Sequence, residues 1–381
     1  MHTFDVVVAG LGGFGSSAAA ALARRGRRVL GLDPRPAVHA EGASTGESRI
    51  VRQAYYEGAG YVPLLLRAYE LWDQLGHDAG APFLRQTGGL FLGAAGTRVL
   101  EGSIRTAREW DLAHEVLDAA AMRSRFPAMT PPDDAIGLYE PVAAAVSPED
   151  TVSAYLRRAV AAGAELRHDE AVTGWSAGAD RVRVETSRGA VDCAALVLAA
   201  GRWTPELLGG LELPLVTEAR VQHWFRPEST SGFGVGELPV WLWDLGGGTS
   251  LYGLPSLAAD GSVKVAVHFS GRGPAAGWTP RELSAAVAPL LPGLGSRHLR
   301  EKHCWYTLTP DENFVVGPHP ASDRVLLACG FSGHGFKFTP VLGEVLADLV
   351  IDGSSSFGLG LFDPSRFGTP RVVTSNTVPA R

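Results

Sequence analysis

Cys304 is the residue whose surroundings most suggest chemistry. It lies in EKHCWYTLTPDENF, among charged and aromatic residues, whereas Cys329 lies in the apolar run VLLACGF. A thiolate is the reactive form of cysteine, and neighbouring cations favour it; Lys302 and His303 directly precede Cys304. Residue type alone nevertheless favours an inert, packed cysteine, because free cysteines are usually buried and unreactive.

Two arginines could bind an anion. Arg49 and Arg52 are three residues apart in SRIVRQAYYEG, so they share a face if this segment is helical. A guanidinium matches a carboxylate with two parallel hydrogen bonds. The alternative interpretation is a pair of surface arginines balanced by Glu47 and Glu57.

Two further segments supply cations. VKVAVHF alternates, which places Lys264 and His268 on one face of a strand, although that face could simply be solvated. In GFSGHGFKF two glycines surround His334, and Lys337 follows. Glycines let backbone N–H groups approach a ligand closely. The alternative for this segment is an ordinary turn with an exposed lysine before the last helix.

A βαβ unit at the N-terminus would position a nucleotide. The β-branched run 6–8 leads into Gly10-x-Gly12-x-x-Gly15, an alanine-rich helix follows, and a second apolar run ends at Asp33. Gly10 allows the tight turn, Gly12 the approach of a pyrophosphate, and Gly15 close packing of helix and strand. The helix N-terminus then faces the phosphates, and Asp33 can accept hydrogen bonds from a ribose. The complete unit predicts a dinucleotide site without choosing between NAD and FAD.

Hydrophobic periodicity and turn residues predict the remaining elements. Helices are expected at 60–76, 147–166, 280–296 (in part) and 340–353, and strands at 87–93, 181–186, 190–201, 221–225, 238–245, 250–256, 263–271 and 324–330. Residues 130–141 are expected to form a loop. The small residues 199–201 at the end of a buried strand would let a second backbone segment approach the dinucleotide.

Length and composition indicate a globular protein of about two domains. The net charge of 34 − 40 = −6 argues against a nucleic-acid partner. Three cysteines suit neither a zinc site nor a disulfide framework, so a reducing cytoplasm is expected. Residues 6–23 carry no charge, but their glycines belong to the nucleotide motif, so no membrane association is expected.

Taken together, these motifs resemble the monomeric sarcosine oxidase and N-methyltryptophan oxidase family, among the D-amino acid oxidase-like flavoenzymes. The resemblance runs nearly end to end through STGESRIVRQAYYEG, TGGLFLG, LAAGRW, CWYTLTPDENF and GFSGHGFKF. It implies an α/β fold with a Rossmann-type FAD-binding domain interleaved with a substrate domain on a mixed or antiparallel sheet. The expected boundaries are 1–76, 145–214 and 309–381 for the FAD-binding domain, and 77–144 and 215–308 for the substrate domain.

The resemblance also implies the cofactor. The family attaches FAD covalently through a cysteine in a C-x-Y-T segment, by a thioether to the flavin 8α-methyl group, and Cys304-Trp305-Tyr306-Thr307 matches that segment. The other residues expected to bind FAD are Gly10, Gly12, Gly15, Asp33, Ser48, Val172, Gly201, Trp203, Gly333, His334 and Gly335. No metal site is expected.

The catalytic residues implied by the resemblance are Lys264, His268, Arg49 and Tyr306, with Lys264 as the cation that promotes reaction with O₂. Arg52, Lys337 and Tyr252 are expected to bind the substrate, the first two through its carboxylate. The expected reaction is oxidation of a secondary amino acid, by hydride transfer to the flavin and reoxidation by O₂, giving an imine and hydrogen peroxide. Sarcosine or another N-methyl amino acid is the leading substrate.

Several alternatives remain at this stage. A cyclic imino acid such as proline or pipecolate, oxidised by a natural-product tailoring enzyme, is the second substrate class. Trp241 and Trp243 share a strand face and either pack in the core or line a pocket for a larger substrate, and Ser48 stands where threonine is expected. An NAD-dependent dehydrogenase would leave the Cys304 segment without a role, and an inactive nucleotide-binding protein is the third class. A monomer is expected.

Overall fold

The computed structural model describes residues 4–368, and within them the chain forms two compact units. Unit 1 comprises residues 4–45, 148–218 and 305–368, and unit 2 comprises 46–147 and 219–304. Each unit is described by itself. The chain thus passes repeatedly between two units, as the interleaved arrangement expected from the sequence requires.

The predicted boundaries differ from these units mainly over residues 46–76, which belong to unit 2. The reason is strand pairing: β3 (Arg49–Val51) pairs antiparallel with β8 (Ala144–Val146), which also belongs to unit 2. The other boundaries, expected at 145, 214 and 309, fall at 148, 218 and 305. The function of each unit is still a prediction.

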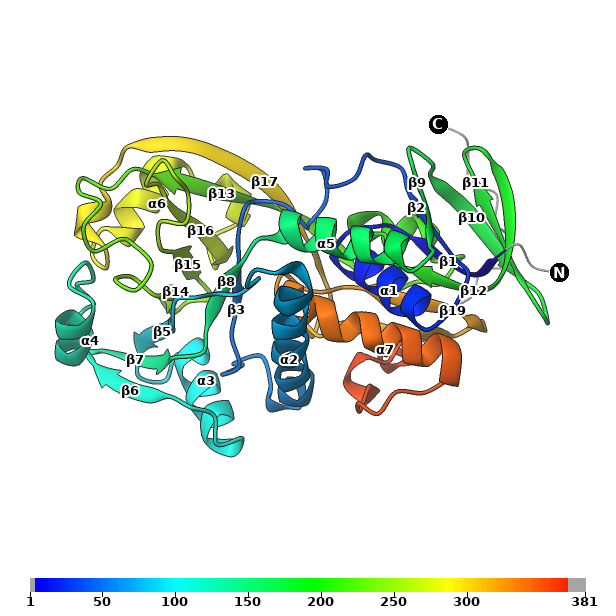
Figure 1. Ribbon diagram of the computed structural model, residues 1–381. Coiled ribbons are helices and arrows are strands. Elements are labelled where there is room, and N and C mark those ends of the chain that lie inside the picture. The colour runs from blue at the N-terminus through cyan, green and yellow to red at the C-terminus, as the bar shows by residue number, and fades with distance from the viewer. Residues whose placement is uncertain (1–3, 369–381) are drawn as a thin grey trace. The chain divides into compact units, whose positions relative to one another are not determined.

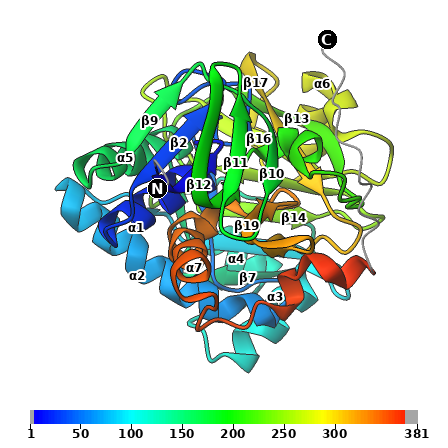
Figure 2. The same ribbon diagram turned by 90° about the vertical axis from the view of Figure 1, so that its right-hand side faces the viewer.

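Unit 1 is built on a mixed sheet whose main path runs β10-β11-β12-β1-β2-β9, with β19 pairing β12 and β18 pairing β19 (Figure 1). Its strands are β1 (Phe4–Ala9), β2 (Val29–Asp33), β9 (Glu165–His168), β10 (Val172–Ala177), β11 (Val182–Thr186), β12 (Gly189–Leu198), β18 (Val315–His319) and β19 (Ser322–Cys329). Its helices are α1 (Gly13–Arg24), α5 (Pro148–Ala161) and α7 (Thr339–Asp352). Both α5 and α7 pack against α1, and Figure 2 shows α7 beside it.

Small side chains explain this close helix packing. The run of alanines in α1 is almost entirely buried, and an added Cβ at Gly343 of α7 would lie 2.8–2.9 Å from Ser17 of α1. The central strands β1 and β2 are buried along nearly their whole length, as parallel strands covered on both faces require. They end at the glycine turn and at Asp33, which brings these two features to one edge of the sheet.

Unit 2 is built on a sheet of order β17-β13-β16-β15-β14-β5-β7-β6 and a smaller sheet of order β3-β8-β4. Its further strands are β4 (Arg85–Gln86), β5 (Gly89–Ala94), β6 (Glu115–Asp118), β7 (Ala135–Glu140), β13 (Val216–Phe225), β14 (Val240–Asp244), β15 (Ser250–Leu254), β16 (Val263–Phe269) and β17 (His298–Leu308). Its helices are α2 (Val62–Ala79), α3 (Arg98–Glu109), α4 (Ala119–Arg125) and α6 (Pro280–Val287). The pair β14–β5 is parallel, whereas β13–β16, β15–β16 and β5–β7 are antiparallel, so the predicted mixed sheet is confirmed.

Most predicted elements are confirmed, one prediction is wrong, and the helical condition considered for Arg49 and Arg52 is not met. Residues 130–141 are not all loop, because 135–140 form β7 and pair with β5. The Arg49–Arg52 segment is not helical, because the β-branched Ile50 and Val51 belong to β3. The two arginines therefore do not share a helical face. Within residues 4–368, every helix is too short or too polar to traverse a lipid bilayer.

The tryptophans of β14 belong to the core of unit 2. Trp241 and Trp243 are buried in one apolar cluster with Val263, Val265 and Val267 of β16. An added Cβ at Gly253 would lie 2.4 Å from the Trp241 ring, so this glycine is needed for the ring to fit. The core-packing interpretation of these two tryptophans is therefore confirmed.

Gly15→Ala is expected to destabilise the fold, because an added Cβ would lie 1.7 Å from the Gly10 carbonyl oxygen. Overpacking against backbone costs about 1–3 kcal/mol in the free energy of unfolding. Urea unfolding followed by circular dichroism measures it. Gly360→Ala is the matched control, because no atom lies within 4 Å of its added Cβ. Equal stability of the two variants would contradict the packing argument.

Candidate functional site

The glycine turn after β1 is shaped by close backbone contacts. Gly10 has φ +89°, and an added Cβ would lie 2.6 Å from the Ala199 carbonyl oxygen. The Leu11 N–H donates to Asp33 Oδ2 at 2.7 Å, and the Arg35 N–H donates to Asp33 Oδ1 at 2.9 Å. A carboxylate has about four acceptor positions, so Asp33 retains capacity for a ribose while it holds the turn.

The N-terminus of α1 is arranged to receive an anion. Its N-cap residue, Gly12, makes no side-chain cap hydrogen bond, and the first turn contains no acidic residue. The Gly13 N–H donates to Ser44 Oγ at 2.9 Å, from the segment that follows β2. N–H groups at a helix N-terminus attract phosphate. The sequence analysis missed Ser44, which is 31 residues from Gly13 in the chain.

The end of β12 places an arginine between two indole rings. Gly201 has φ +56°, and the Arg202 guanidinium lies 4.4 Å from the Trp203 ring and 4.3 Å from the Trp305 ring. Arg202 Nε is buried without a hydrogen-bond partner among the described residues. Val172, by contrast, packs against the apolar core of unit 1, so it could contact a cofactor only through its backbone or its methyl groups.

The GFSGHGFKF turn packs directly on the C-x-Y-T segment. Gly333 has φ +80°, and an added Cβ would lie 2.1 Å from the Tyr306 ring. The Ser332 N–H donates to the Thr307 carbonyl at 2.9 Å, which joins the two motifs through the backbone. This contact requires glycine at 333, and it joins the turn to Tyr306 and Thr307, the part of the C-x-Y-T segment that belongs to unit 1.

Two side chains of that turn are engaged within unit 1. Lys337 is buried, and its ammonium donates to the His334 carbonyl at 2.7 Å. His334 Nε2 lies 2.9 Å from the Glu312 carbonyl oxygen, so that ring nitrogen carries the proton. An added Cβ at Gly335 would lie 2.7 Å from Phe331. The alternative of an exposed lysine is therefore wrong.

In unit 2, Lys264 is a buried cation held by oxygen atoms. Its side chain projects from β16, and its ammonium donates to the carbonyls of Gly46 at 2.9 Å and Ser48 at 2.8 Å. Ser48 Oγ lies 3.3 Å away as a third acceptor. These acceptors are neutral, so they satisfy the N–H groups without cancelling the charge. The alternative of a solvated Lys264 is wrong, because the residue is only 2% exposed.

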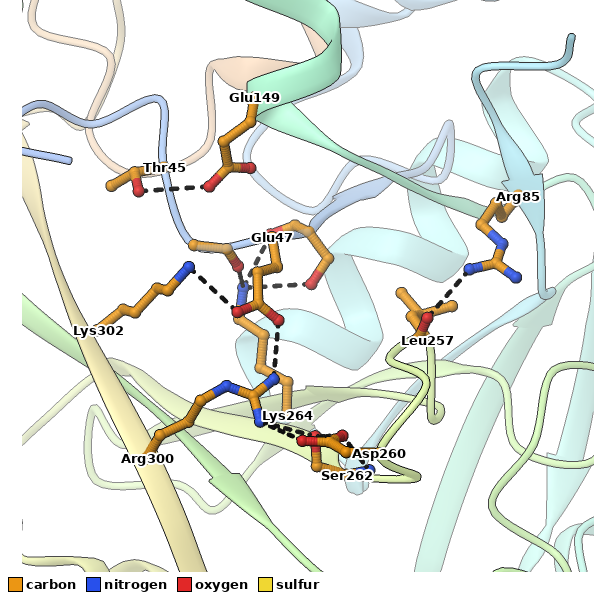
Figure 3. A network of polar contacts seen from close by, with 12 residues as sticks. Thr45, Glu47, Arg85, Glu149, Leu257, Asp260, Ser262, Lys264, Arg300 and Lys302 are labelled. Carbon is orange, nitrogen blue, oxygen red and sulfur yellow. Dashed lines mark hydrogen bonds and ion pairs between the residues drawn. The ribbon is translucent and has the colours of Figure 1, made fainter. Parts of the chain in front are cut away.

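Glu47 anchors the segment that supplies these carbonyls. Its carboxylate lies 2.9 Å from Arg300 and 3.1 Å from Lys302, both on β17 (Figure 3). Arg300 also reaches Asp260 at 2.7 Å. Glu47 itself has φ +66°, which is uncommon for a residue other than glycine. The ion pairs of Glu47 hold this conformation, in which the carbonyls on either side of it, those of Gly46 and Ser48, accept from Lys264.

Cys304 is buried, yet it has a polar partner. Gln222 Nε2 of β13 lies 3.3 Å from its Sγ, whereas Cys193 and Cys329 lie in the apolar core of unit 1. Burial raises the pKa of each of those two thiols to about 12. Gln222 Oε1 is buried without a hydrogen-bond partner among the described residues. Among the three cysteines, all within the described residues, Cys304 is therefore the one with a polar side chain as its hydrogen-bond partner, whereas Cys193 Sγ lies 3.6 Å from the Val182 carbonyl oxygen.

Arg52 is buried and paired, not exposed. Its Nη2 lies 2.6 Å from both Glu57 carboxylate oxygens, and its Nη1 donates to the Ala54 carbonyl at 2.9 Å. The guanidinium also lies 4.4 Å from the Tyr55 ring. Burial acts to lower the pKa of Arg52, but the Glu57 carboxylate reverses this and the pKa is raised. The predicted Glu57 pairing is thus present, although not at the surface.

The remaining predicted residues of unit 2 lie near these groups. His268 is buried and its Nε2 lies 3.1 Å from the Tyr56 hydroxyl, while its ring meets Tyr252 edge-on with centroids 6.2 Å apart. Arg49 donates from Nη1 to the Ser48 carbonyl at 2.8 Å. Since the Tyr56 ring also lies 4.7 Å from the Arg52 guanidinium, contacts run from His268 through Tyr56 to Arg52.

The structure therefore groups the predicted residues by unit. Ser48, Arg49, Arg52, Tyr252, Lys264, His268 and Cys304 belong to unit 2, and Gly10, Gly12, Gly15, Asp33, Val172, Gly201, Trp203, Tyr306, Gly333, His334, Gly335 and Lys337 belong to unit 1. Sequence reasoning missed Gln222, Glu47 and Tyr56, whose partners are distant in the chain. A polar residue on an alternating strand, as in VQHWF, was the one available signal for Gln222.

These features fit FAD. The turn at Gly10 and the helix N-terminus that follows Gly12 suit a pyrophosphate, and Asp33 suits a ribose. The unpartnered polar atoms Arg202 Nε and Gln222 Oε1 are buried groups for which a bound polar molecule would supply partners.

Comparisons with known proteins agree with this fit. The family described as FAD dependent oxidoreductase matches residues 5–349. Monomeric sarcosine oxidase of Streptomyces avermitilis is 42% identical over 96% of this chain and 98% of its own length, and N-methyl-L-tryptophan oxidase of Salmonella dublin is 34% identical over 96% and 99%.

Among solved structures, NikD, an unusual amino acid oxidase essential for nikkomycin biosynthesis, has a TM-score of 0.84 at 24% identity, covering 99% of this chain and 100% of that one. L-proline dehydrogenase from P. horikoshii has a TM-score of 0.81 at 23% identity, covering 95% and 97%. These two likenesses support the fold. The chain therefore belongs to the FAD-dependent oxidoreductase family, together with monomeric sarcosine oxidase and N-methyl-L-tryptophan oxidase.

Proposed function

We propose that this chain is an oxidase of a secondary amino acid, with sarcosine or another N-methyl amino acid as substrate and FAD attached through Cys304. The observation that carries the proposal is the buried Lys264 ammonium, on the same sheet as the Gln222–Cys304 pair. The two sequence relatives, an oxidase of sarcosine and one of N-methyl-L-tryptophan by name, support this substrate class.

FAD, when bound, supplies the redox chemistry: it accepts a hydride equivalent from the substrate and passes two electrons to O₂, giving hydrogen peroxide. The residues of this chain orient the substrate and place charge. Lys264 provides a fixed positive charge that stabilises the negative charge developing on oxygen. Its hydrogen bonds to backbone carbonyls keep the ammonium in place, so the charge needs no reorganisation during the reaction.

We assign binding of the substrate carboxylate to Arg52, with Lys337 as the second predicted ligand. Arg52 already pairs with Glu57, so a substrate carboxylate either replaces Glu57 or shares the guanidinium, which has five N–H donors. The neighbouring Tyr56 and His268 would adjust to that exchange, because they lie in the same line of contacts. A monomeric, cytoplasmic protein is part of the same proposal, and the lack of a disulfide among Cys193, Cys304 and Cys329 is consistent with a reducing compartment.

An anaerobic screen of amino acids against flavin absorbance tests the function. N-methyl amino acids should bleach the flavin, and bleaching by proline or pipecolate instead would favour the cyclic imino acid alternative. Arg52→Ala should weaken carboxylate ligands by roughly 2–4 kcal/mol, as expected for loss of a charge-assisted pair. Arg67→Ala is the control, since Arg67 forms an exposed ion pair with Glu70. Unchanged affinity in Arg52→Ala would place the anion elsewhere, and no bleaching by any amino acid would refute the proposed activity.

The attachment through Cys304 is tested by acid precipitation. The yellow colour should remain in the protein pellet of the wild-type enzyme and move to the supernatant for Cys304→Ser. Cys193→Ala is the control, because Cys193 lies in the core of unit 1 and should leave the colour in the pellet. Wild-type colour in the supernatant, or residue 304 found unmodified by peptide mass spectrometry, would exclude the attachment.

The role of Lys264 is tested by measuring the two half-reactions separately. Lys264→Met should slow reoxidation by O₂ much more than anaerobic reduction, because the charge is needed mainly when oxygen is reduced. Glu47→Gln should act in the same direction but more weakly, since it loosens the segment that carries the two carbonyl acceptors.

Glu115→Gln is the control for Glu47→Gln, since it removes an exposed ion pair with Arg125 in the same unit. Equal slowing of both half-reactions by Lys264→Met would remove its assigned role. Wild-type reoxidation in Glu47→Gln would leave the lysine assignment standing and discard only the supporting role of Glu47.

A further inference from the structure

Three side chains with metal-binding atoms converge where β13 and β17 lie side by side in unit 2. His223 Nδ1 lies 3.2 Å from His298 Nε2 and 3.5 Å from Glu301 Oε2. All three ligand atoms lie within 4.8 Å of one another. His303 Nε2 lies 3.6 Å from the other oxygen of Glu301, so a third imidazole adjoins the group.

Two of the three separations between these ligand atoms match a coordination sphere, and the third, between His298 and Glu301, is within 4.8 Å. A zinc ion binds histidine nitrogen and carboxylate oxygen at about 2.0–2.2 Å, and tetrahedral angles then set the ligand atoms roughly 3.3–3.5 Å apart. The separations of 3.2 and 3.5 Å around His223 Nδ1 match those edges. One ion at the centre would therefore reach its ligands with little movement of the backbone.

The group is buried on the side of His223 and exposed to solvent on the side of Glu301. His223 is 3% exposed, and the His298 ring packs edge-on against Phe225 with centroids 5.5 Å apart. Glu301 is 44% exposed, which leaves a path for an ion to enter.

We propose that His223, His298 and Glu301 bind one divalent transition-metal ion of the zinc type, with water or His303 in the fourth position. Two imidazoles and a carboxylate are a donor set that selects such ions over Mg²⁺ and Ca²⁺, which prefer oxygen ligands alone. The sequence analysis expected no metal site and did not consider these residues, since His223 lies 75 residues before His298 and no short motif joins them.

The position of the group gives the ion a structural task. Arg300, Lys302 and Cys304 of β17 contact Glu47 and Gln222, whereas the intervening Glu301 contacts His223. The ion would therefore join β13 to β17. Glu301 alternates along β17 with Arg300 and Lys302, and His298 adds a ligand at the start of the strand. Its binding should stabilise unit 2 whether or not the proposed oxidase activity is correct.

Isothermal titration of the purified, flavin-loaded protein with Zn²⁺ tests the site. One ion per chain should bind, Mg²⁺ should not, and the midpoint of thermal unfolding should rise with Zn²⁺. Glu301→Gln should weaken Zn²⁺ binding by at least about tenfold, since even loss of a group that only orients a metal ligand costs 10–100-fold. His223→Ala should abolish binding, and Glu301→Gln keeps the test valid if that buried substitution prevents folding.

His77→Ala is the matched control, because His77 lies exposed near the end of α2 in the same unit and should leave Zn²⁺ binding unchanged. Difference absorption with Co²⁺ in place of Zn²⁺ should show the intense bands of tetrahedral coordination, and these should disappear in Glu301→Gln. No Zn²⁺ binding by the wild-type protein, or equal binding by wild-type and Glu301→Gln proteins, would overturn the proposal. Flavin reduction in the anaerobic amino acid screen tests the proposed oxidase activity independently of Zn²⁺ binding, so failure of one proposal can be told from failure of the other.

Discussion

The burial of one ammonium group organises much of unit 2. An unpaired charge removed from water costs several kcal/mol, roughly, so Lys264 can be buried only where oxygen atoms are held around it. Those atoms come from residues 46–48, a segment with two left-handed residues in succession, Gly46 at φ +101° and Glu47 at φ +66°. The same glycine passes so close to Gln222 that an added Cβ would lie 1.9 Å from its Oε1. One short segment therefore satisfies Lys264 and limits the position of the partner of Cys304.

The sheet of unit 2 separates packing from chemistry by its alternation. Val263, Val265 and Val267 enter the core with Trp241 and Trp243, and the intervening Lys264 and His268 carry the polar contacts. Every second residue is thus available for a different task without weakening the core. This arrangement explains how a strand of seven residues holds both a buried cation and a tightly packed apolar face.

Unit 1 relies on glycines where backbone segments meet. Gly10 lets the turn after β1 approach the end of β12, and Gly15 lets the start of α1 pack against Gly10 in that turn. Gly333 lets the turn before α7 pack against Tyr306. Asp33 then joins the end of β2 to this turn through the Leu11 N–H. Each contact places N–H groups and a helix N-terminus at one edge of the sheet, which is the arrangement by which related folds bind a dinucleotide.

Local features were readable from the sequence alone. The glycine spacing, the alternation of β16 and the helical patterns of α1, α2, α5 and α7 depend on residues close together in the chain, and they were predicted. The family was predicted as well, because each of its motifs is a short stretch of neighbouring residues. The strand at β7 and the strand conformation of Arg49–Val51 were not, because each forms by pairing with a strand that lies elsewhere in the chain.

Only the tertiary structure decided which side chains meet. Gln222 and Cys304 are 82 residues apart, Ser48 and Lys264 are 216 apart, and Glu47 and Arg300 are 253 apart. Periodicity indicates which face a residue occupies, but not the register that places it opposite a particular partner. The Arg52–Glu57 pair shows the same limit at short range: its residues were noted, but its burial depends on how the rest of unit 2 packs around it.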